Sequence, residues 1–206
     1  NFVPYMKACL DRYAADRKVM NVNGYSPPIT IPENYPHDVF FTYRSSSWGW
    51  GTWEDAWEHY EFDPMTLNEL QNNRESIRQT TAKAGTDLFP MMRNQLTGNI
   101  DSWAVWWSYA IIKNNGLCVN PVQSKVRNIG HDGSGTHTGD SDKYNINLDD
   151  THIEDMNFVD EPFVDDRINR RYTRFFGGHR GVLKQTITSV FRKMRLWGRN
   201  RLFRRK

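Results

Sequence analysis

The chain has 206 residues, 38% of them hydrophobic, which is enough for one domain or one and a half with a modest core. No run of about 18 apolar residues occurs and no secretory leader pattern is present, so the sequence excludes a long apolar membrane span. The two cysteines, Cys9 and Cys118, lie far apart in apolar contexts and predict buried free thiols rather than a disulfide. Because the chain begins at Asn1 rather than Met, we expect it to be cut from a longer protein.

The net charge of +3 conceals a strong asymmetry along the chain. Residues 167–206 carry 14 Lys and Arg and no Asp or Glu. Residues 1–166 carry 13 Lys and Arg against 24 Asp and Glu, a net charge of −11. This division favours an acidic body followed by a basic arm for an anionic partner.

The first half of the chain reads as alternating helix and strand. Apolar spacing predicts a helix over residues 4–13, and β-branched and aromatic content predicts strands over 19–22 and 38–43. A tryptophan-rich stretch follows the second strand directly, at the kind of strand-to-helix junction where α/β sheets bind ligands.

The second half continues the mixed α/β order. Helical segments are predicted at 64–84, at 89–95 and from Asp101 or Ser102 to about residue 114. Short strands are predicted at 117–119 and 125–129. The remaining segments are a glycine-rich loop over 130–139, an acidic irregular segment over 140–160 and a helix in the tail that begins near residue 182.

Tryptophan usage is the most informative feature, because seven of the eight residues fall in 47–57 and 101–107. Trp is a poor choice for merely filling a core, since its indole N–H needs a partner even when buried. Indole faces interleaved with glycine and carboxylates are typical of a carbohydrate or nucleotide site. Trp53 and Trp57 lie four residues apart, so we interpret them as one core-facing side of a helix.

The first stretch predicts a ligand-facing loop. Trp48 and Trp50 alternate in sequence, so both should face the same side of an extended segment. Gly49 and Gly51 would let the backbone come close to a ligand.

Asp101 and the glycine-rich loop are the remaining candidates for chemistry. Asp101 precedes an apolar helix, where it can cap the helix or stay ionised as a general base. The backbone N–H groups of Gly133, Ser134 and Gly135 suit phosphate oxygens, and His131 and His137 are potential metal ligands or diphosphate donors.

The tail over 182–206 interleaves Lys and Arg with Trp, Phe and Leu. This pattern favours an interfacial helix on an anionic membrane. Nucleic-acid binding and a solvated end are the alternatives.

Three motifs in order, SWGWGTWEDAW (47–57), NIDSWAVWW (99–107) and VRNIGHDGSGTH (126–137), resemble the C-terminal half of bacterial family-2-type sugar transferases with a GT-A fold. The layout is similar, more distantly, to the animal N-acetylglucosaminyltransferase that initiates complex N-glycans. The resemblance covers roughly residues 1–140. It implies a GT-A-like mixed α/β sheet flanked by helices, without the N-terminal nucleotide-binding half and with a basic C-terminal tail.

The resemblance also implies a reaction. Such enzymes use a nucleotide-sugar donor and a divalent metal, Mn²⁺ or Mg²⁺, whose main acidic ligands would lie upstream of this chain. Asp101 matches the general base of an inverting displacement, and His137 matches a histidine that reaches the diphosphate or its metal. The residues expected to contact donor and acceptor are Trp48, Gly49, Trp50, Gly51, Trp103, Gly133, Ser134 and Gly135. Two positions depart from the family: Trp106 stands where an Arg is usual, and His131 where an aromatic residue is frequent.

Together these features predict an incomplete catalytic domain of a glycosyltransferase for bacterial surface polysaccharide, acting on a glycan or lipid-linked acceptor. It would be cytoplasmic and peripheral at the inner face of the membrane, held there by residues 182–206, with no nucleic-acid partner. We expect three parts: an acceptor-side half (1–140), an acidic irregular segment (141–166) and a basic amphipathic tail (167–206). The alternatives are a non-catalytic carbohydrate-binding module and a basic-tailed nucleic-acid-binding protein, against which the acidic body argues.

Overall fold

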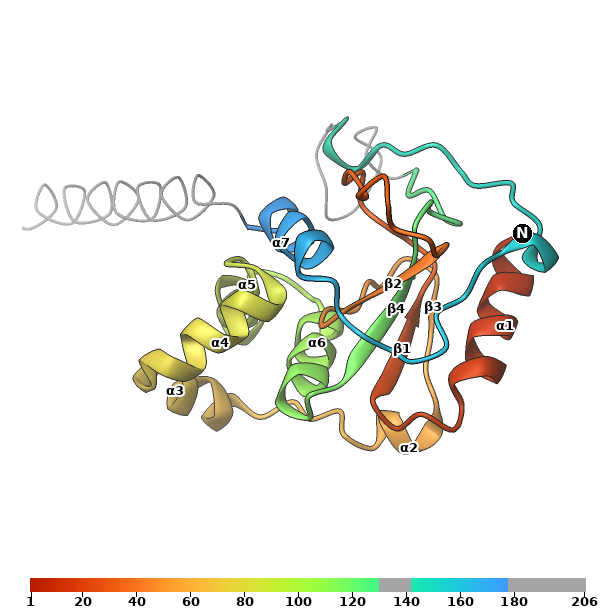
Figure 1. Ribbon diagram of the computed structural model, residues 1–206. Helices are drawn as coiled ribbons and strands as arrows, with labels where there is room; N and C mark the ends of the chain where they lie inside the picture. The colour runs from red at the N-terminus through yellow and green to blue at the C-terminus, as the bar shows by residue number, and fades with distance from the viewer. Residues whose placement is uncertain (130–141, 178–206) are drawn as a thin grey trace, which may run out of the picture.

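A mixed four-stranded sheet lies between helix α1 on one face and helix α6 on the other (Figure 1). The computed structural model describes residues 1–129 and 142–177. Within these residues the helices are α1 (Phe2–Tyr13), α2 (Glu54–Trp57), α3 (Pro64–Asn72), α4 (Arg74–Ala84), α5 (Leu88–Leu96), α6 (Trp103–Lys113) and α7 (Asp166–Phe175). Two short 3₁₀ turns, Asp142–Tyr144 and Ile153–Asp155, lie in the segment before α7. The expected mixed α/β class is confirmed.

The strand order is β2–β4–β1–β3, with β1 (Val19–Asn23), β2 (Val39–Thr42), β3 (Trp50–Gly51) and β4 (Leu117–Pro121). The central pair, β1 and β4, is parallel, and each outer strand runs antiparallel to its neighbour. The predicted strands at 19–22, 38–43 and 117–119 are therefore confirmed. The two-residue β3 was not predicted.

The strand predicted at 125–129 is wrong, because local hydrogen bonds hold this segment in another conformation. The Ser124 hydroxyl donates to the Val126 carbonyl at 2.8 Å, which bends the chain. The Lys125 ammonium turns inward to the Asp149 carboxylate at 2.6 Å. The turn at Ser124 is incompatible with an extended strand, and the buried lysine adds a charge where the strand prediction expected an apolar face.

The helix predicted over 64–84 is two helices that meet at Asn73. This residue has extended backbone angles, and its side-chain oxygen accepts hydrogen bonds from the N–H groups of Glu75 and Ser76. It therefore caps the start of α4 where α3 ends. Asp63 caps α3 in the same way, through the N–H groups of Met65 and Thr66.

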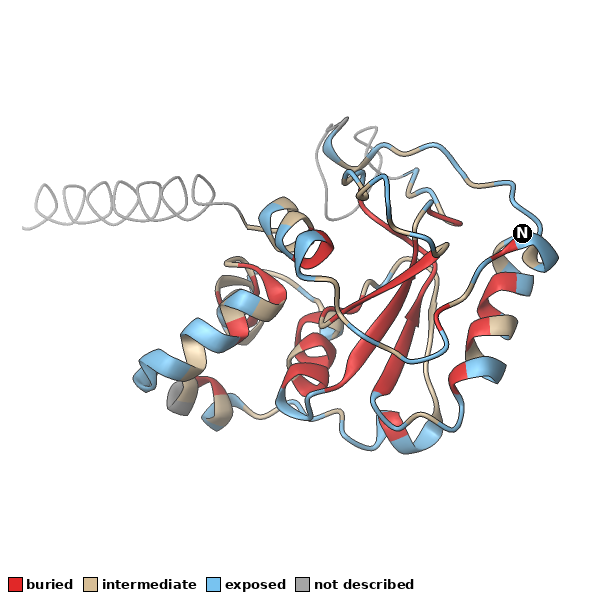
Figure 2. Cartoon of the chain, viewed as in Figure 1, coloured by how far each residue is buried: buried red, intermediate tan, exposed pale blue. Residues whose placement is uncertain are grey.

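The α1 face of the sheet forms the larger core, and β1, β2 and β4 are buried along their whole length (Figure 2). Tyr13 packs edge-on against Phe41 at 5.4 Å and donates to the carbonyl of Val159 at 2.8 Å. The irregular segment before α7 thus completes this core. Cys9 and Cys118 are buried free thiols, as predicted, and burial raises the pKa of Cys9 to about 12.

The opposite face carries α6 and α7. Ile168 and Tyr172 of α7 are fully buried and pack on Phe40 of β2. The first part of the basic segment is therefore part of the folded body, and the boundary expected between residues 166 and 167 falls inside a helix. No helix among the described residues is long and apolar enough to cross a membrane.

Candidate functional site

A network of uncharged polar side chains is buried between the sheet and α6. Asn21 donates to Asn23 Oδ1 at 2.7 Å, and Asn23 donates to Asn120 Oδ1 at 2.8 Å. Asn120 in turn donates to Thr42 Oγ1 at 3.1 Å. The indole N–H of Trp107 on α6 donates to Asn21 Oδ1 at 3.0 Å. The network therefore ties the ends of three strands to the buried side of α6.

The same network holds the loop between β2 and β3. Asn23 Nδ2 donates to the carbonyl of Arg44 at 3.2 Å, and Asn23 Oδ1 accepts from the N–H of Ser46 at 2.8 Å. Ser45 and Ser108 hydroxyls lie 3.0 Å apart. Buried polar groups that find partners in this way fix one geometry, because each alternative leaves a donor or acceptor unpaired.

A buried ion pair fixes the start of this loop. The Arg44 guanidinium donates to both carboxylate oxygens of Asp87, at 2.6 and 2.9 Å, and to the carbonyl of Ala84 at 2.9 Å. It also lies over the Phe176 ring, 4.4 Å from the centroid. Burial by itself lowers the pKa of Arg44, but the adjacent Asp87 outweighs it and holds that pKa above its ordinary value.

Residues 44–51, here called the tryptophan loop, contain Gly49 and Gly51, and the protein's own packing leaves little room for a side chain at either position. Gly49 has φ +62°, and its carbonyl accepts from the N–H of Gly24 at 2.7 Å. A Cβ at Gly49 would stand 2.7 Å from Val126 Cγ2, and one at Gly51 would stand 3.1 Å from Met6 Cε. Close backbone approach thus occurs within the fold, and contact of these glycines with a ligand stays a prediction.

The positive φ of Gly49 also separates the two flanking indoles. Trp48 packs on Tyr25 and Tyr144, with ring centroids 4.5 and 5.5 Å apart. Trp50 turns instead toward α2 and α6. The expectation that Trp48 and Trp50 face one side is therefore wrong, because it assumed an unbroken extended segment.

Trp50 belongs to an aromatic cluster that joins the two tryptophan stretches. Its members are Trp50, Trp57, Tyr60, Trp103 and Trp107. Trp50 lies 4.8 Å from Trp103 and 5.6 Å from Trp57, between ring centroids. Trp57 stacks on Tyr60 at 4.7 Å with an interplanar angle of 8°. Segments about fifty residues apart in sequence thus form one group of flat apolar faces.

Part of the aromatic cluster is open to solvent. Trp57 and Trp103 each expose 37% of their surface, whereas Trp107 is fully buried. The core interpretation is therefore wrong for Trp57. It fits Trp53 better, because Trp53 packs against the α1 core and donates its indole N–H to the Leu10 carbonyl at 3.2 Å.

Asp101 lies beside the aromatic cluster, in the connection between α5 and α6. Its side chain is exposed, and Ser102 alone separates it in sequence from Trp103, a Cα separation of at most about 7 Å. Asp101 does not cap α6, because Ser102 occupies the N-cap position and its N–H donates to the Gln95 side chain. Within the described residues no hydrogen bond or ion pair to the Asp101 carboxylate is found, so its oxygens are open to hydrogen-bond donors of a ligand.

Trp106 is a core residue. It exposes 1% of its surface, packs edge-on against Phe62 at 4.9 Å, and its indole N–H has no hydrogen-bond partner among the described residues. The position where the resembling family usually carries Arg is thus filled here by an apolar ring.

The residues predicted to bind phosphate and metal belong to another part of the chain. Gly133, Ser134, Gly135, His131 and His137 fall outside the described residues, as does 182–206. In residues 1–129 and 142–177, no three His, Cys, Asp or Glu side chains are grouped so as to hold a metal ion.

Sequence reasoning missed the amide network, Tyr60 and the arginines of α7. Asn21 and Asn23 alternate within a strand whose every residue is buried, and this alternation was a usable signal. A second usable signal was the spacing of the arginines in α7, at positions i, i+3, i+4 and i+7. Comparison with family models, with curated proteins and with solved structures finds no match to this chain.

Proposed function

We propose that the chain is the acceptor-side half of a GT-A-type glycosyltransferase that moves a sugar, with inversion, from a nucleotide-sugar to a glycan or lipid-linked acceptor in bacterial surface polysaccharide synthesis. The observation that carries the proposal is the aromatic cluster with its two partly exposed indoles, of which Trp103 lies two positions after the exposed residue Asp101. Sugar rings present apolar C–H faces and hydroxyl edges. Indoles match the faces, and a carboxylate accepts from the hydroxyls.

In the proposed reaction Asp101 is the general base. The acceptor hydroxyl gives its proton to the Asp101 carboxylate as its oxygen forms a bond to the anomeric carbon of the donor. The bond from that carbon to the diphosphate oxygen breaks on the opposite face, and the nucleoside diphosphate leaves with the electron pair. A positioned base contributes typically 10²- to 10⁴-fold to such a step.

The family resemblance also calls for a divalent metal, which would neutralise the charge that develops on the leaving diphosphate. The described residues offer no group of three ligands for it. His137 and acidic residues upstream of the chain are therefore the proposed ligands, and the residues described here act on the acceptor and the sugar.

The proposed location is the cytoplasmic face of the inner membrane, with peripheral attachment through residues 182–206. Basic residues interleaved with Trp and Phe support this part of the proposal, because they match an anionic interface. It would place the Asp101 site near a lipid-linked acceptor.

The test is nucleotide release from a panel of UDP- and GDP-sugars with Mn²⁺, using the chain extended upstream through the expected Asp-rich segment. We expect release that falls 10²- to 10⁴-fold in Asp101→Asn. The matched control is Glu154→Gln, an exposed carboxylate on the α1 side of the sheet. Release that is the same in Asp101→Asn as in the control would remove Asp101 from the mechanism.

The same cluster also suits a carbohydrate-binding module that transfers nothing. Sugar binding that quenches tryptophan fluorescence, together with no nucleotide release across the whole panel, would favour that second function. Nucleic-acid binding is the weaker alternative, because residues 1–166 carry a net charge of −11.

A further inference from the structure

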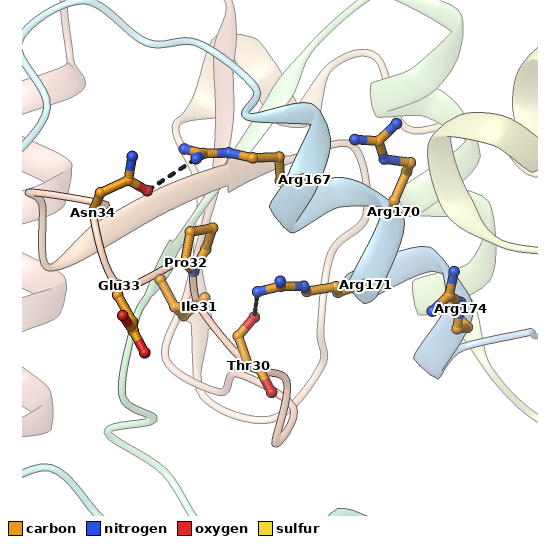
Figure 3. Close-up of a pocket in the computed structure, with 9 residues that line it drawn as sticks. All are labelled: Thr30, Ile31, Pro32, Glu33, Asn34, Arg167, Arg170, Arg171 and Arg174. Atoms are coloured by element: carbon orange, nitrogen blue, oxygen red, sulfur yellow. Dashed lines mark hydrogen bonds between the residues drawn. The ribbon is translucent and has the colours of Figure 1, made fainter.

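Helix α7 presents four arginines along one side. Arg167, Arg170, Arg171 and Arg174 follow the i, i+3, i+4, i+7 spacing of a single helix face. With residues 30–34 they line an open pocket of about 660 Å³ (Figure 3). We call these four side chains the arginine face.

The packing of α7 fixes the direction of the arginine face. Ile168 and Tyr172 are fully buried against β2, and Asn169 is buried beside them. The helix cannot rotate without exposing these side chains, so the arginines are held toward solvent.

The charge of the arginine face is largely uncompensated. Arg167 pairs with Asp165 at 2.7 Å and donates to Asn34 Oδ1 at 2.9 Å. Arg171 donates to the carbonyl of Thr30 at 2.6 Å, which is a neutral acceptor. These two bonds draw the guanidinium groups over segment 30–34, as Figure 3 shows.

The other two arginines are open to a partner. Arg170 and Arg174 are exposed, and the guanidinium group of neither forms an ion pair or hydrogen bond with any residue in the described ranges. Glu33 is the single carboxylate among the residues that line the pocket. A row of guanidinium groups about 10 Å long therefore faces outward, at a rise of roughly 1.5 Å per residue.

We infer that the arginine face is a docking surface for the phosphate headgroups of an anionic membrane. Guanidinium groups pair with phosphate oxygens in a bidentate geometry. The chain that follows α7 adds ten Lys and Arg and no acid over residues 178–206, so the face begins a longer basic segment. A flat membrane can meet this segment alone, whereas a nucleic acid that wraps the protein would also meet the acidic body.

The inference rests on the peripheral location proposed above and adds to it a surface within the folded body. It does not depend on glycosyl transfer. Its test is therefore a binding measurement without donor or acceptor.

The experiment is co-sedimentation of the full chain with vesicles of phosphatidylcholine containing phosphatidylserine, at low salt. The variant Arg170→Gln/Arg174→Gln should bind about 30-fold more weakly, because each basic residue near an anionic surface adds about 1 kcal/mol, roughly a fivefold factor. The matched control is Arg74→Gln/Arg93→Gln, which removes the same charge from exposed positions on α4 and α5. We expect its binding to change by less than about threefold, through the longer-range field alone.

Four results would overturn the inference. Equal losses in the two double variants would show an effect of net charge only. A loss in Arg204→Gln/Arg205→Gln with none in the α7 variant would assign binding to the tail, and the peripheral location would stand without the arginine face. Competition by millimolar inorganic phosphate, or tighter binding of duplex DNA that the α7 substitutions abolish, would reassign the face to a single phosphate or to nucleic acid. Nucleotide release with a soluble acceptor does not depend on any of these binding results, so it tests the proposed sugar transfer separately.

Discussion

The buried pair of Arg44 and Asp87 gives the sharpest stability prediction. The Arg44 side chain is 9% exposed and the Asp87 side chain 24%. The substitution Asp87→Asn removes the negative charge and leaves the guanidinium buried with only neutral acceptors. The loop that carries Trp48 and Trp50 begins at this arginine, so the substitution also loosens the tryptophan loop.

The magnitude follows from the geometry. Removing one partner of a buried ion pair costs about 3–5 kcal/mol in the free energy of unfolding. Asp87 is a quarter exposed, and the new amide oxygen keeps one acceptor for Arg44, so we expect about 2–3 kcal/mol. For a chain of this size that corresponds to a fall in Tm of about 5–10 °C.

The assay is urea unfolding followed by tryptophan fluorescence, with calorimetry for Tm. The matched control is Glu75→Gln, which removes the partner of Arg78 in an exposed pair on α4. We expect little change there, because exposed pairs contribute little. The double variant Arg44→Met/Asp87→Leu should recover most of the lost stability, since an apolar replacement leaves no unpaired charge. Equal effects of Asp87→Asn and Glu75→Gln would refute the reasoning.

Two further predictions concern buried polar contacts. Trp107→Phe removes the donor to Asn21 Oδ1, so the free energy of unfolding should fall by about 1–3 kcal/mol in urea titrations; a change under about 0.5 kcal/mol would contradict the role of this bond. The second concerns acid unfolding: burial raises the pKa of Asp149, but hydrogen bonds from Lys125 and Thr151 outweigh it and hold that pKa below its usual value. The stabilisation is therefore full above the unfolded pKa of about 3.9 and is lost as pH falls through that value toward the lowered pKa. Asp149→Asn should reduce the slope of the free energy of unfolding against pH below about pH 5. An unchanged slope in this range would count against the Lys125–Asp149 pair.

The sequence predicted the helices and strands better than the boundaries and contacts between them. The helix that contains Cys9 showed a helical apolar period because one face of it is buried, and the strand that contains Phe40 was evident from its β-branched and aromatic content because both of its faces are buried. The break at Asn73 was hidden, since both flanking segments have helical composition and the cap is visible only through its hydrogen bonds.

The candidate site was predicted in composition but not in geometry. Trp50 and Trp103 were both named from sequence, but their contact depends on a turn at Gly49 that alternation in sequence does not reveal. Tyr60 was missed although it lies three residues after Trp57, because it stacks on Trp57 through the local turn that ends α2. The strand prediction at 125–129 failed because the sequence does not reveal the turn at Ser124 or the burial of Lys125 against Asp149, which is distant in sequence.

The tryptophan loop is held by uncharged hydrogen bonds and, at its start, by one ion pair. The side chains of Asn21, Asn23, Asn120 and Ser45 hold this loop through amides and hydroxyls. Such groups gain and lose no protons in the range where proteins stay folded, and bonds between them are insensitive to ionic strength. Added salt should therefore act on this loop through the Arg44–Asp87 pair at its start, while the hydrogen bonds from the amides and hydroxyls persist.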